Sequence, residues 1–397
     1  MKRRTNETTG PEALKRRDAL EVYLTMRFPG FAHSAVSAIV TPITGLAPTW
    51  RERQPVFANG KLRHVYALLG GLSTGTALVL AGPGLGLKVI GSVLLAGALR
   101  NLSAGTGHEL THSTAGLPWG PKVVDGKRKP DTLTPAVYDA VTAVALLPSW
   151  KTYQVVHGWH HAFAGVQGEG VDPDEQMVES LGARFTGWGA FLRTLADPVL
   201  HWNFLTMRLR ASLGAGAKGS RKKGGPNEIP SNPVWRRVLA GLVSVAITFA
   251  LPWQAALAWW LAVVLLYQVF SLCSLAVLHL WGYRAPEGAK PGVVATTITF
   301  GRLLIPDANW TAWFKLPLYA LVRATFLNSA LQSHDQHHRG KLDWWDAPYV
   351  RTALLLEGAE VWQTTSLRAA FETAFEAARR LPGRSDGWAS DDEMLGV

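Results

Sequence analysis

The sequence contains twelve histidines, and eight of them fall into three compact clusters. In chain order, the clusters read His108-Glu-Leu-Thr-His112, His157-Gly-Trp-His160-His161 and His334-Asp-Gln-His337-His338. On a helix, residues three and four positions apart share a face, so each cluster can direct two or three imidazoles toward one point. Neutral imidazole is the commonest side-chain metal ligand. The spacing therefore predicts a metal site rather than scattered core or surface histidines.

The number of imidazoles indicates how many ions they could hold. Eight or nine exceed what one tetrahedral ion can use, but they suit two ions that keep open positions for oxygen. Imidazole binds zinc, copper, iron and nickel, so ligand type alone does not select the metal. Redox chemistry at such a site favours iron. We expect two non-haem iron ions, with dioxygen as co-substrate.

Two carboxylates stand inside the clusters, and two more follow the second cluster. Glu109 and Asp335 lie next to predicted ligands, where a carboxylate commonly orients an imidazole through its second nitrogen. Asp172 and Asp174 could act in the same way. A solvated charge is the alternative for each of the four.

Two long apolar blocks indicate an integral membrane protein. One runs from about residue 65 to 102 and breaks at Gly82-Pro83-Gly84; the other runs from about 238 to 280 and breaks near Pro252. Each block is long enough for a helical hairpin. We expect four spans, near residues 65–82, 85–103, 236–252 and 254–280. Hydrophobic residues make up 48% of the chain and charged residues only 17%, which agrees with this assignment.

The distribution of positive charge predicts the orientation of these hairpins. Their turns carry no Lys or Arg, whereas the preceding segments carry Arg51, Arg53, Lys61, Arg63, Arg208, Arg210, Lys222 and Arg236. Basic segments stay on the cytosolic side, so both termini and all three clusters should be cytosolic. The same bias explains the net charge of +11 without nucleic-acid binding, for which no motif is present.

The predicted lengths of two helices indicate that part of the metal site lies outside the membrane. Read as single helices, residues 85–112 and 254–280 would be about 42 and 40 Å long, whereas the hydrocarbon core is about 30 Å thick. The cytosolic ends, with His108, His112 and His279, should therefore reach or pass the membrane surface.

The predicted fold class is an all-α integral membrane protein with two transmembrane hairpins and a cytosolic helical cap that holds the histidines. Apolar stretches at 28–50, 135–150 and 291–330 are predicted to be interfacial or shallow re-entrant helices. Residues 1–64 form a cytosolic N-terminal and interfacial segment, 65–352 the membrane domain, and 353–397 a C-terminal amphipathic helix with an acidic tail. The lone Cys273 excludes an intramolecular disulfide and fits a reducing compartment.

The order of hairpin, cluster, cluster, hairpin and cluster resembles the membrane di-iron superfamily of acyl-lipid desaturases, alkane hydroxylases and related hydroxylases. The resemblance covers most of residues 60–350. The segments 107–112 and 331–338 are similar to alkane-hydroxylase versions, whereas the middle cluster has the His-x-x-His-His spacing of desaturases, with Asp172-Pro173-Asp174 downstream. The resemblance implies a mushroom-shaped helical protein, a di-iron centre, and electrons from a ferredoxin, rubredoxin or b-type cytochrome with its reductase.

The same resemblance implies an extra ligand at His279, although a lone histidine at a helix end can also be a capping residue. The candidate ligands are then His108, His112, His157, His160, His161, His279, His334, His337 and His338, and the candidate orienting residues are Glu109 and Asp335.

The implied activity is oxidation of an unactivated C–H bond in an apolar, lipid-like substrate that enters from the bilayer. Hydroxylation and desaturation both remain open. The main alternative is a membrane zinc protease, because His-Glu-x-x-His on a helix is also a metalloprotease motif. That alternative leaves both His-x-x-His-His clusters unexplained. A non-catalytic receptor or channel would leave the clustered histidines without a role.

Overall fold

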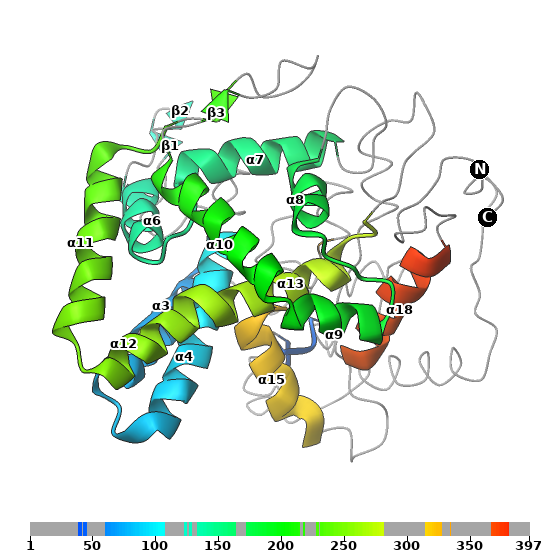
Figure 1. Ribbon diagram of the computed structural model, residues 1–397, viewed down its shortest axis with the longest axis horizontal. Coiled ribbons are helices and arrows are strands. Elements are labelled where there is room, and N and C mark those ends of the chain that lie inside the picture. The colour runs from blue at the N-terminus through cyan, green and yellow to red at the C-terminus, as the bar shows by residue number, and fades with distance from the viewer. Residues whose placement is uncertain are drawn as a thin grey trace.

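The computed structural model describes residues 39–41, 43–45, 60–107, 123–124, 127–128, 133–163, 172–214, 217–218, 228–229, 231–281, 314–327, 334 and 367–380. Within these residues the protein is almost entirely helical, as the sequence predicts (Figure 1). The helices are α3 (Gly60–Ala81), α4 (Gly84–Asn101), α6 (Leu133–Val144), α7 (Trp150–Phe163), α8 (Pro173–Leu181), α9 (Trp188–Ala196), α10 (Pro198–Leu213), α11 (Val234–Ala250), α12 (Trp253–Trp260), α13 (Tyr267–Leu278), α15 (Leu316–Thr325) and α18 (Leu367–Arg380).

Short irregular elements complete this set. Two π-helical turns, η1 (Leu102–Thr106) and η2 (Leu261–Leu266), extend α4 and join α12 to α13. Two antiparallel ladders pair β1 (Val123–Val124) with β2 (Lys127–Arg128), and β3 (Ala217–Lys218) with β4 (Glu228–Ile229). Each strand has two residues, so the ladders only close loops.

The first hairpin pairs α3 with α4 at unusually close range. A Cβ added at Gly75 would lie 2.6 Å from the backbone nitrogen of Leu95, and one added at Gly91 would lie 2.7 Å from the Cβ of Leu78. Such small residues let two helices approach closely in a membrane, where packing drives helix association. The turn uses Gly84 at a φ of +77°, a conformation that glycine adopts without steric cost.

The turn itself is uncharged, but a lysine lies one helical turn beyond it. The buried Lys88 donates through Nζ to the carbonyl oxygens of Val79 (2.9 Å) and Leu80 (3.2 Å). These carbonyls belong to the last turn of α3, where a cation is favoured by the helix dipole. The positive charge of Lys88 is therefore stabilised by hydrogen bonds within the hairpin.

The second hairpin pairs α11 with the continuous helix α12–η2–α13. By length and composition, two described helices could cross a membrane, at Gly84–Thr106 and Trp253–Leu278. They match two of the four predicted spans. Helices also form at the other two, but the apolar part of α3 covers only Ala67–Ala81, and α11 has 17 residues. Membrane crossing by α3 and α11 stays a prediction.

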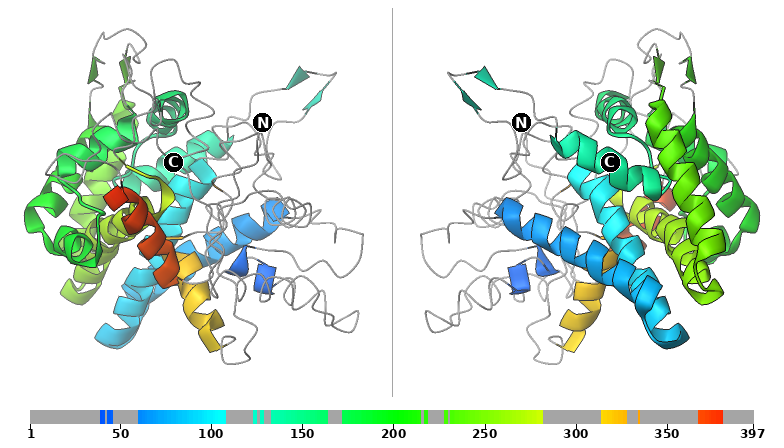
Figure 2. Two further views of the ribbon diagram at one scale, coloured as in Figure 1. Left: turned by 90° about the vertical axis from the view of Figure 1, so that its right-hand side faces the viewer. Right: turned by 90° about the vertical axis from the view of Figure 1, so that its left-hand side faces the viewer.

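The hairpin turns lie at one end of the molecule, and α7 and α8 lie at the opposite end (Figures 1 and 2). This arrangement separates an apolar hairpin layer from a helical cap. The exposed side chains of the hairpins are largely apolar, as in Leu85, Ile90, Leu242 and Phe249.

Two arginines of the basic segments that precede the second hairpin, Arg208 and Arg236, are buried. Arg236 is fully buried and donates to the carbonyl oxygens of Asp139 and Leu147, the Asp139 carboxylate (3.1 Å) and the Thr142 hydroxyl. It thereby ties α11 to α6 and to the turn after it.

The second of these arginines, Arg208 on α10, makes an equivalent connection. It donates to the carbonyl oxygens of Val263 (2.9 Å) and Ala145 (3.1 Å), and its guanidinium lies 4.3 Å from the centre of the Tyr267 ring. Guanidinium has enough fixed donors to satisfy several carbonyls at once, so both arginines join the cap to the second hairpin.

The apolar stretches predicted at the interface differ from a simple helix. Residues 135–150 are not one helix: α6 ends at Val144, and the chain turns through Leu146 at a φ of +55° before α7 begins at Trp150. Of 28–50 and 291–330, the structure describes 39–41, 43–45 and 314–327. There Arg323 on α15 donates to the carbonyl oxygen of Ile43 (2.8 Å), and α15 packs on α4. Their depth in the membrane stays a prediction.

The C-terminal amphipathic helix predicted after residue 367 is present as α18. Phe371 and Phe375 pack on Trp188 and Phe191 of α9, with ring centres 5.1 to 5.8 Å apart. The acidic tail lies outside the described residues. By this packing, α18 belongs to the same hydrophobic core as α8, α9, α10 and α13.

Candidate metal centre

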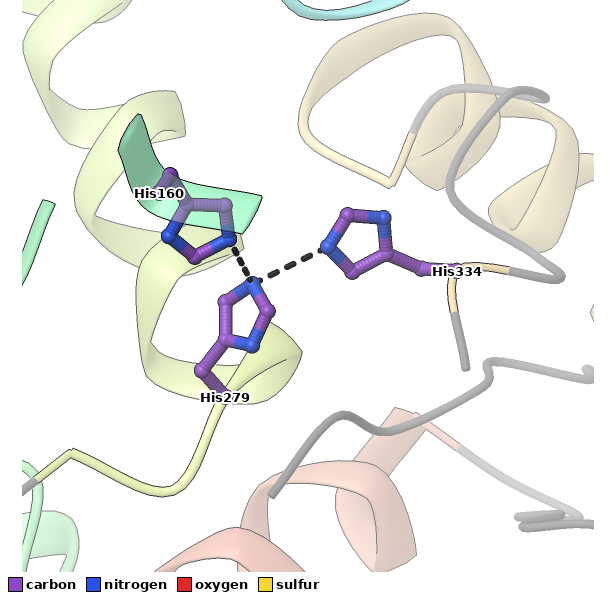
Figure 3. A group of neighbouring side chains, drawn as sticks. All are labelled: His160, His279 and His334. Atoms are coloured by element: carbon purple, nitrogen blue, oxygen red, sulfur yellow. Dashed lines mark hydrogen bonds between the residues drawn. The ribbon is translucent and has the colours of Figure 1, made fainter. Parts of the chain in front are cut away.

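Three of the predicted ligands converge on one point, although they come from distant parts of the sequence (Figure 3). His160 lies on α7, His279 follows the last residue of α13, and His334 comes from the third cluster. The Nε2 atom of His279 is 3.1 Å from Nε2 of His160 and 3.0 Å from Nε2 of His334. All three are buried, with 2%, 4% and 4% of their surfaces exposed. Their ring nitrogens form a group able to hold a metal ion.

A second pair of imidazoles lies beside this group. His157 and His161 are one helical turn apart on α7, and their Nε2 atoms are 3.0 Å apart. Their ring centres are 6.0 and 5.8 Å from that of His160. Tyr153, one turn earlier, stacks on His157 at 5.4 Å. The second cluster thus presents all three histidines on one side of α7, as the helical spacing predicts.

Hydrogen bonds alone do not explain why the Nε2 atoms of His160, His279 and His334 lie so close together. Nδ1 of His160 faces a carboxylate and carries a proton, so Nε2 is an acceptor in the neutral ring and a donor in the charged ring. The Nε2 of His279 has either one proton to donate or one lone pair to accept with, so in either case it can form a hydrogen bond with only one of its two neighbours. A cation at the common point would accept the lone pairs of all three rings. The donor set therefore fits a metal ion.

Asp172 supplies the carboxylate that orients His160. Both of its oxygens lie 2.9 Å from Nδ1 of His160, and Asp172 is 3% exposed. Its Oδ1 also accepts the backbone N–H of Asp174, so the same side chain caps the N-terminus of α8. Of the two roles considered for Asp172 from the sequence, the structure shows the contact with an imidazole. Asp174 lies farther off, at 3.8 Å.

The environment of His160 favours its charged form when no metal is bound. Burial lowers the pKa of His160, but the charge and hydrogen bond of Asp172, with Asp174 and Glu175, outweigh it and raise the pKa to about 9. A metal ion at Nε2 would replace the proton on that atom, and the same carboxylates would stabilise its positive charge through the imidazole ring. Glu175, which is 6% exposed, is a contributor that the sequence reading missed. Its position one residue after Asp174 in the first turn of α8 was the available signal.

Trp281 fixes the backbone next to His279. Its ring lies against His279 with centres 5.2 Å apart, and its Nε1 donates to the carbonyl oxygen of Leu275 at 2.8 Å. The helix predicted to reach residue 280 ends at Leu278, and His279 is extended, with φ −133° and ψ 155°. The change of direction turns the imidazole toward the other two histidines.

A small recess lies beside this centre. It has a volume of about 20 Å³ and is lined by Ala183, Arg184, Phe185, Thr186, Ala276, His279, Leu280, Trp281, Ala374 and Ala378. These residues belong to the loop before α9, the end of α13 and its continuation, and α18. His279 is thus shared by the three-histidine group and the recess.

The remaining predicted site residues lie outside the described part of the chain: His108, Glu109, His112, Asp335, His337 and His338. Their ligand and orienting roles stay predictions. The first cluster follows directly on η1 and Gly107, where the described part of the first hairpin ends. His201 stands outside the three clusters, and its ring has structural partners: its Nδ1 is 2.9 Å from Gln268 and its Nε2 is 2.9 Å from the Leu195 carbonyl oxygen.

Apolar helical hairpins, a helical cap and a buried group of imidazoles able to hold a metal ion are features typical of a membrane-associated metalloprotein. Residues 83–314 match the model of the fatty acid desaturase family, which covers more than half of the chain. The protein belongs to this family, a class of membrane-bound non-haem di-iron oxidoreductases. No curated protein and no solved structure matches the chain significantly. Nothing in these comparisons supports the zinc protease alternative.

Proposed function

We propose that this protein is a di-iron oxygenase that oxidises an unactivated C–H bond in an acyl chain or a similar lipid-like substrate. The observation that carries the proposal is the convergence of His160, His279 and His334 in a chain of the fatty acid desaturase family. In this proposal the nine histidines named from the sequence hold two irons, and Glu109 and Asp335 orient ligands.

The irons would supply the reduction of dioxygen and the oxidising power for hydrogen abstraction. The overall reactions balance in two ways. One dioxygen, two electrons and two protons convert a C–H bond to an alcohol and one water. The same inputs convert a CH₂–CH₂ unit to an alkene and two waters. The electrons would come from a ferredoxin, rubredoxin or b-type cytochrome with its reductase.

The chain's own residues would contribute orientation and exclusion of water. Asp172 holds the proton on Nδ1 of His160 and thereby leaves Nε2 directed at the metal. Burial of the three histidines keeps bulk water from the centre. An apolar substrate would enter between the spans from the bilayer, because transfer through water would oppose its movement.

Topology forms part of the proposal. Four spans, with both termini and the cap in the cytosol, would agree with the positive charge before each hairpin. Residues 1–64, 65–352 and 353–397 would be the N-terminal segment, the di-iron domain and the C-terminal helix with its tail.

The test is metal content followed by product analysis. Protein purified in detergent should contain about two irons per chain, as expected for a site of this ligand number. The double variant His160→Ala, His334→Ala should lose them, whereas His201→Ala, outside the centre, should keep them. Incubation with acyl lipids, dioxygen and a reductase system should then yield a hydroxylated or unsaturated product. One zinc per chain, retained in the double variant, would contradict the proposal.

A further inference from the structure

A buried arginine in the first hairpin bears on the class of substrate, and the inference drawn from it rests on the proposed function. Among the residues that the structure describes, four arginines are buried: Arg100, Arg208, Arg236 and Arg323. The last three each donate to two or more backbone carbonyl oxygens, which accounts for their positions in the fold. Arg100 differs, because within the described structure its guanidinium makes one hydrogen bond, from Nη2 to the Ser274 hydroxyl at 3.0 Å.

The pair formed by Arg100 and Ser274 has more hydrogen-bond donors than acceptors. A guanidinium has five N–H donors and no acceptor. The Nε of Arg100 is buried and has no hydrogen-bond partner among the described residues. Ser274 is also buried, and because its oxygen accepts from Arg100, its hydroxyl proton is directed elsewhere. The pair therefore presents several donors and a positive charge to an acceptor that the described residues do not supply.

The charge of Arg100 has no direct counter-ion in the part of the chain that the structure describes, where the ion pairs involve other residues. Arg100 does lie within electrostatic reach of Asp174: burial raises the pKa of Asp174 and His160 lowers it, and the charge of Arg100 also lowers it. This places the guanidinium on the side of the three-histidine group. A buried charge without a direct counter-ion is unfavourable, and inside a membrane it typically marks a functional site.

The depth of the pair in the molecule suits a substrate that reaches the centre from the bilayer. Arg100 lies about 24 Å along α4 from Gly84, within a hydrocarbon core about 30 Å thick. Ser274 precedes His279 by about 7.5 Å along α13. Helices α4 and α13 pack on each other, so the pair lies between the two hairpins, on the membrane side of the centre. The π-helical turn η1, a feature common at functional sites, begins directly after Asn101.

A carboxylate is the ligand that fits this pair. The planar guanidinium matches a carboxylate with two parallel N–H···O bonds, and the Ser274 hydroxyl supplies a further donor. Opposite charges also cancel, whereas an ester or an alcohol would leave the charge of Arg100 unpaired. The side chains next to the pair on the two helices include the buried apolar residues Leu99 and Leu275. These surroundings suit the hydrocarbon chain attached to such an acid.

We propose that Arg100 and Ser274 bind the carboxylate of an unesterified fatty acid and thereby hold its chain at the metal centre. The substrate class is then a free apolar acid rather than an alkane or an acyl chain esterified to a lipid. Arg100 and Ser274 fix the acid end by charge and hydrogen bonds, and the hairpins enclose the chain.

The first experiment measures binding without turnover. Radiolabelled oleic acid, methyl oleate and phosphatidic acid are each bound to the protein as purified in detergent, by scintillation proximity. The wild type should bind oleic acid at least about tenfold more tightly than methyl oleate, because only the acid pairs with the buried charge. Arg100→Met should lower the affinity for oleic acid by about 30-fold or more and leave that for methyl oleate unchanged. Ser274→Ala should lower it by about tenfold.

Two matched controls accompany these variants. Arg237→Met removes the same charge from an exposed position on α11, and Ser271→Ala removes the same hydroxyl from another buried position on α13. Both should bind oleic acid as the wild type does.

The second experiment separates ligand binding from a structural role of Arg100. Because Arg100 lacks a direct counter-ion among the described residues, Arg100→Met should keep or raise the melting temperature. Its metal content should equal that of the wild type. A lower melting temperature or a lower metal content in Arg100→Met would overturn the proposal, because Arg100 would then act through the fold or through the centre.

The outcomes also separate this inference from the proposed function. Acid-selective binding that depends on Arg100 supports the carboxylate site, even if the protein holds no iron and oxidises no lipid. Equal affinity for oleic acid and methyl oleate, unchanged in Arg100→Met, overturns the site and leaves the oxygenase proposal standing. Binding of phosphatidic acid as tight as that of oleic acid, with the same loss in Arg100→Met, would also overturn it, because the pair would then recognise the phosphate of a lipid headgroup.

Discussion

Removing the carboxylate of Asp172 should weaken both metal binding and the fold, and a second substitution at the same position can separate the two effects. Asp172 accepts a hydrogen bond from Nδ1–H of His160 at 2.9 Å and caps α8. In Asp172→Ala, loss of the cap costs about 1 kcal/mol of unfolding free energy, and the unpartnered imidazole N–H costs about 1–3 kcal/mol more. Loss of a carboxylate that orients a ligand typically lowers metal affinity by about 10- to 100-fold. We expect both the stability loss and the affinity loss to lie near the upper ends of these ranges, because the contact between Asp172 and His160 is buried.

Asp172→Asn separates the two roles. The amide oxygen can still cap α8 and accept the imidazole proton, but the negative charge is gone, so we expect about a tenfold loss of affinity and near-normal stability. The matched control is Asp197→Ala, because Asp197 caps α10 through Val199 and Leu200 in an exposed position. It should cost about 1 kcal/mol without changing metal affinity.

The assay is a titration of metal-free protein in nanodiscs with cobalt(II), whose visible spectrum reports ligand number, together with thermal unfolding. The expected order of affinity is wild type equal to Asp197→Ala, then Asp172→Asn, then Asp172→Ala. Wild-type cobalt affinity in Asp172→Ala would refute the assignment of Asp172 as a residue that positions His160.

Three further predictions follow. The pKa of His160 is raised to about 9 in the metal-free protein, so below that pH a metal ion must displace a proton from the ring. The apparent affinity of the protein for the metal should therefore rise as the pH increases toward 9 and then level off. A metal affinity that does not change with pH would contradict this prediction. A Cβ at Gly97 would lie 2.0 Å from a carbonyl oxygen of α15, so Gly97→Leu should lower the unfolding free energy by about 3 kcal/mol or more. Gly86→Leu, in open space on the same helix, should change the unfolding free energy little. Equal melting temperatures of the two variants would refute the close packing of α4 on α15. Arg236→Met should cost about 3–5 kcal/mol by leaving a carboxylate unpaired, against little change for the exposed Arg237→Met, as measured by thermal unfolding in detergent.

Local sequence pattern was sufficient to predict the helices of the two hairpins and the shared helical face of the second histidine cluster. Apolar runs broken by Gly82-Pro83-Gly84 and Pro252 predict two helical hairpins, and the structure has helices within a few residues of each predicted span. The His-x-x-His-His spacing predicts one shared face of α7, because helical geometry repeats every 3.6 residues. These are consequences of short-range sequence order.

Contacts between residues that are far apart in the chain could not be predicted from local sequence pattern. The sequence analysis uses Arg208 and Arg236 only as positive charge before the second hairpin, whereas the tertiary structure buries both against backbone carbonyls of other elements. The turn at Leu146 likewise depends on packing, because a leucine at positive φ is strained and no local signal favours it.

The same division applies to the centre. The sequence by itself predicted imidazole ligands and determined that one helix carries three of the clustered histidines, since these features depend on residue type and helical period. Only the tertiary structure decided that His279 and His334 meet His160, that the Asp172 carboxylate lies against Nδ1 of His160, and that His279 lines a small recess. Those contacts join residues 119 and 55 positions apart in the chain, and such pairs are set by how the hairpins and the cap pack rather than by any local propensity.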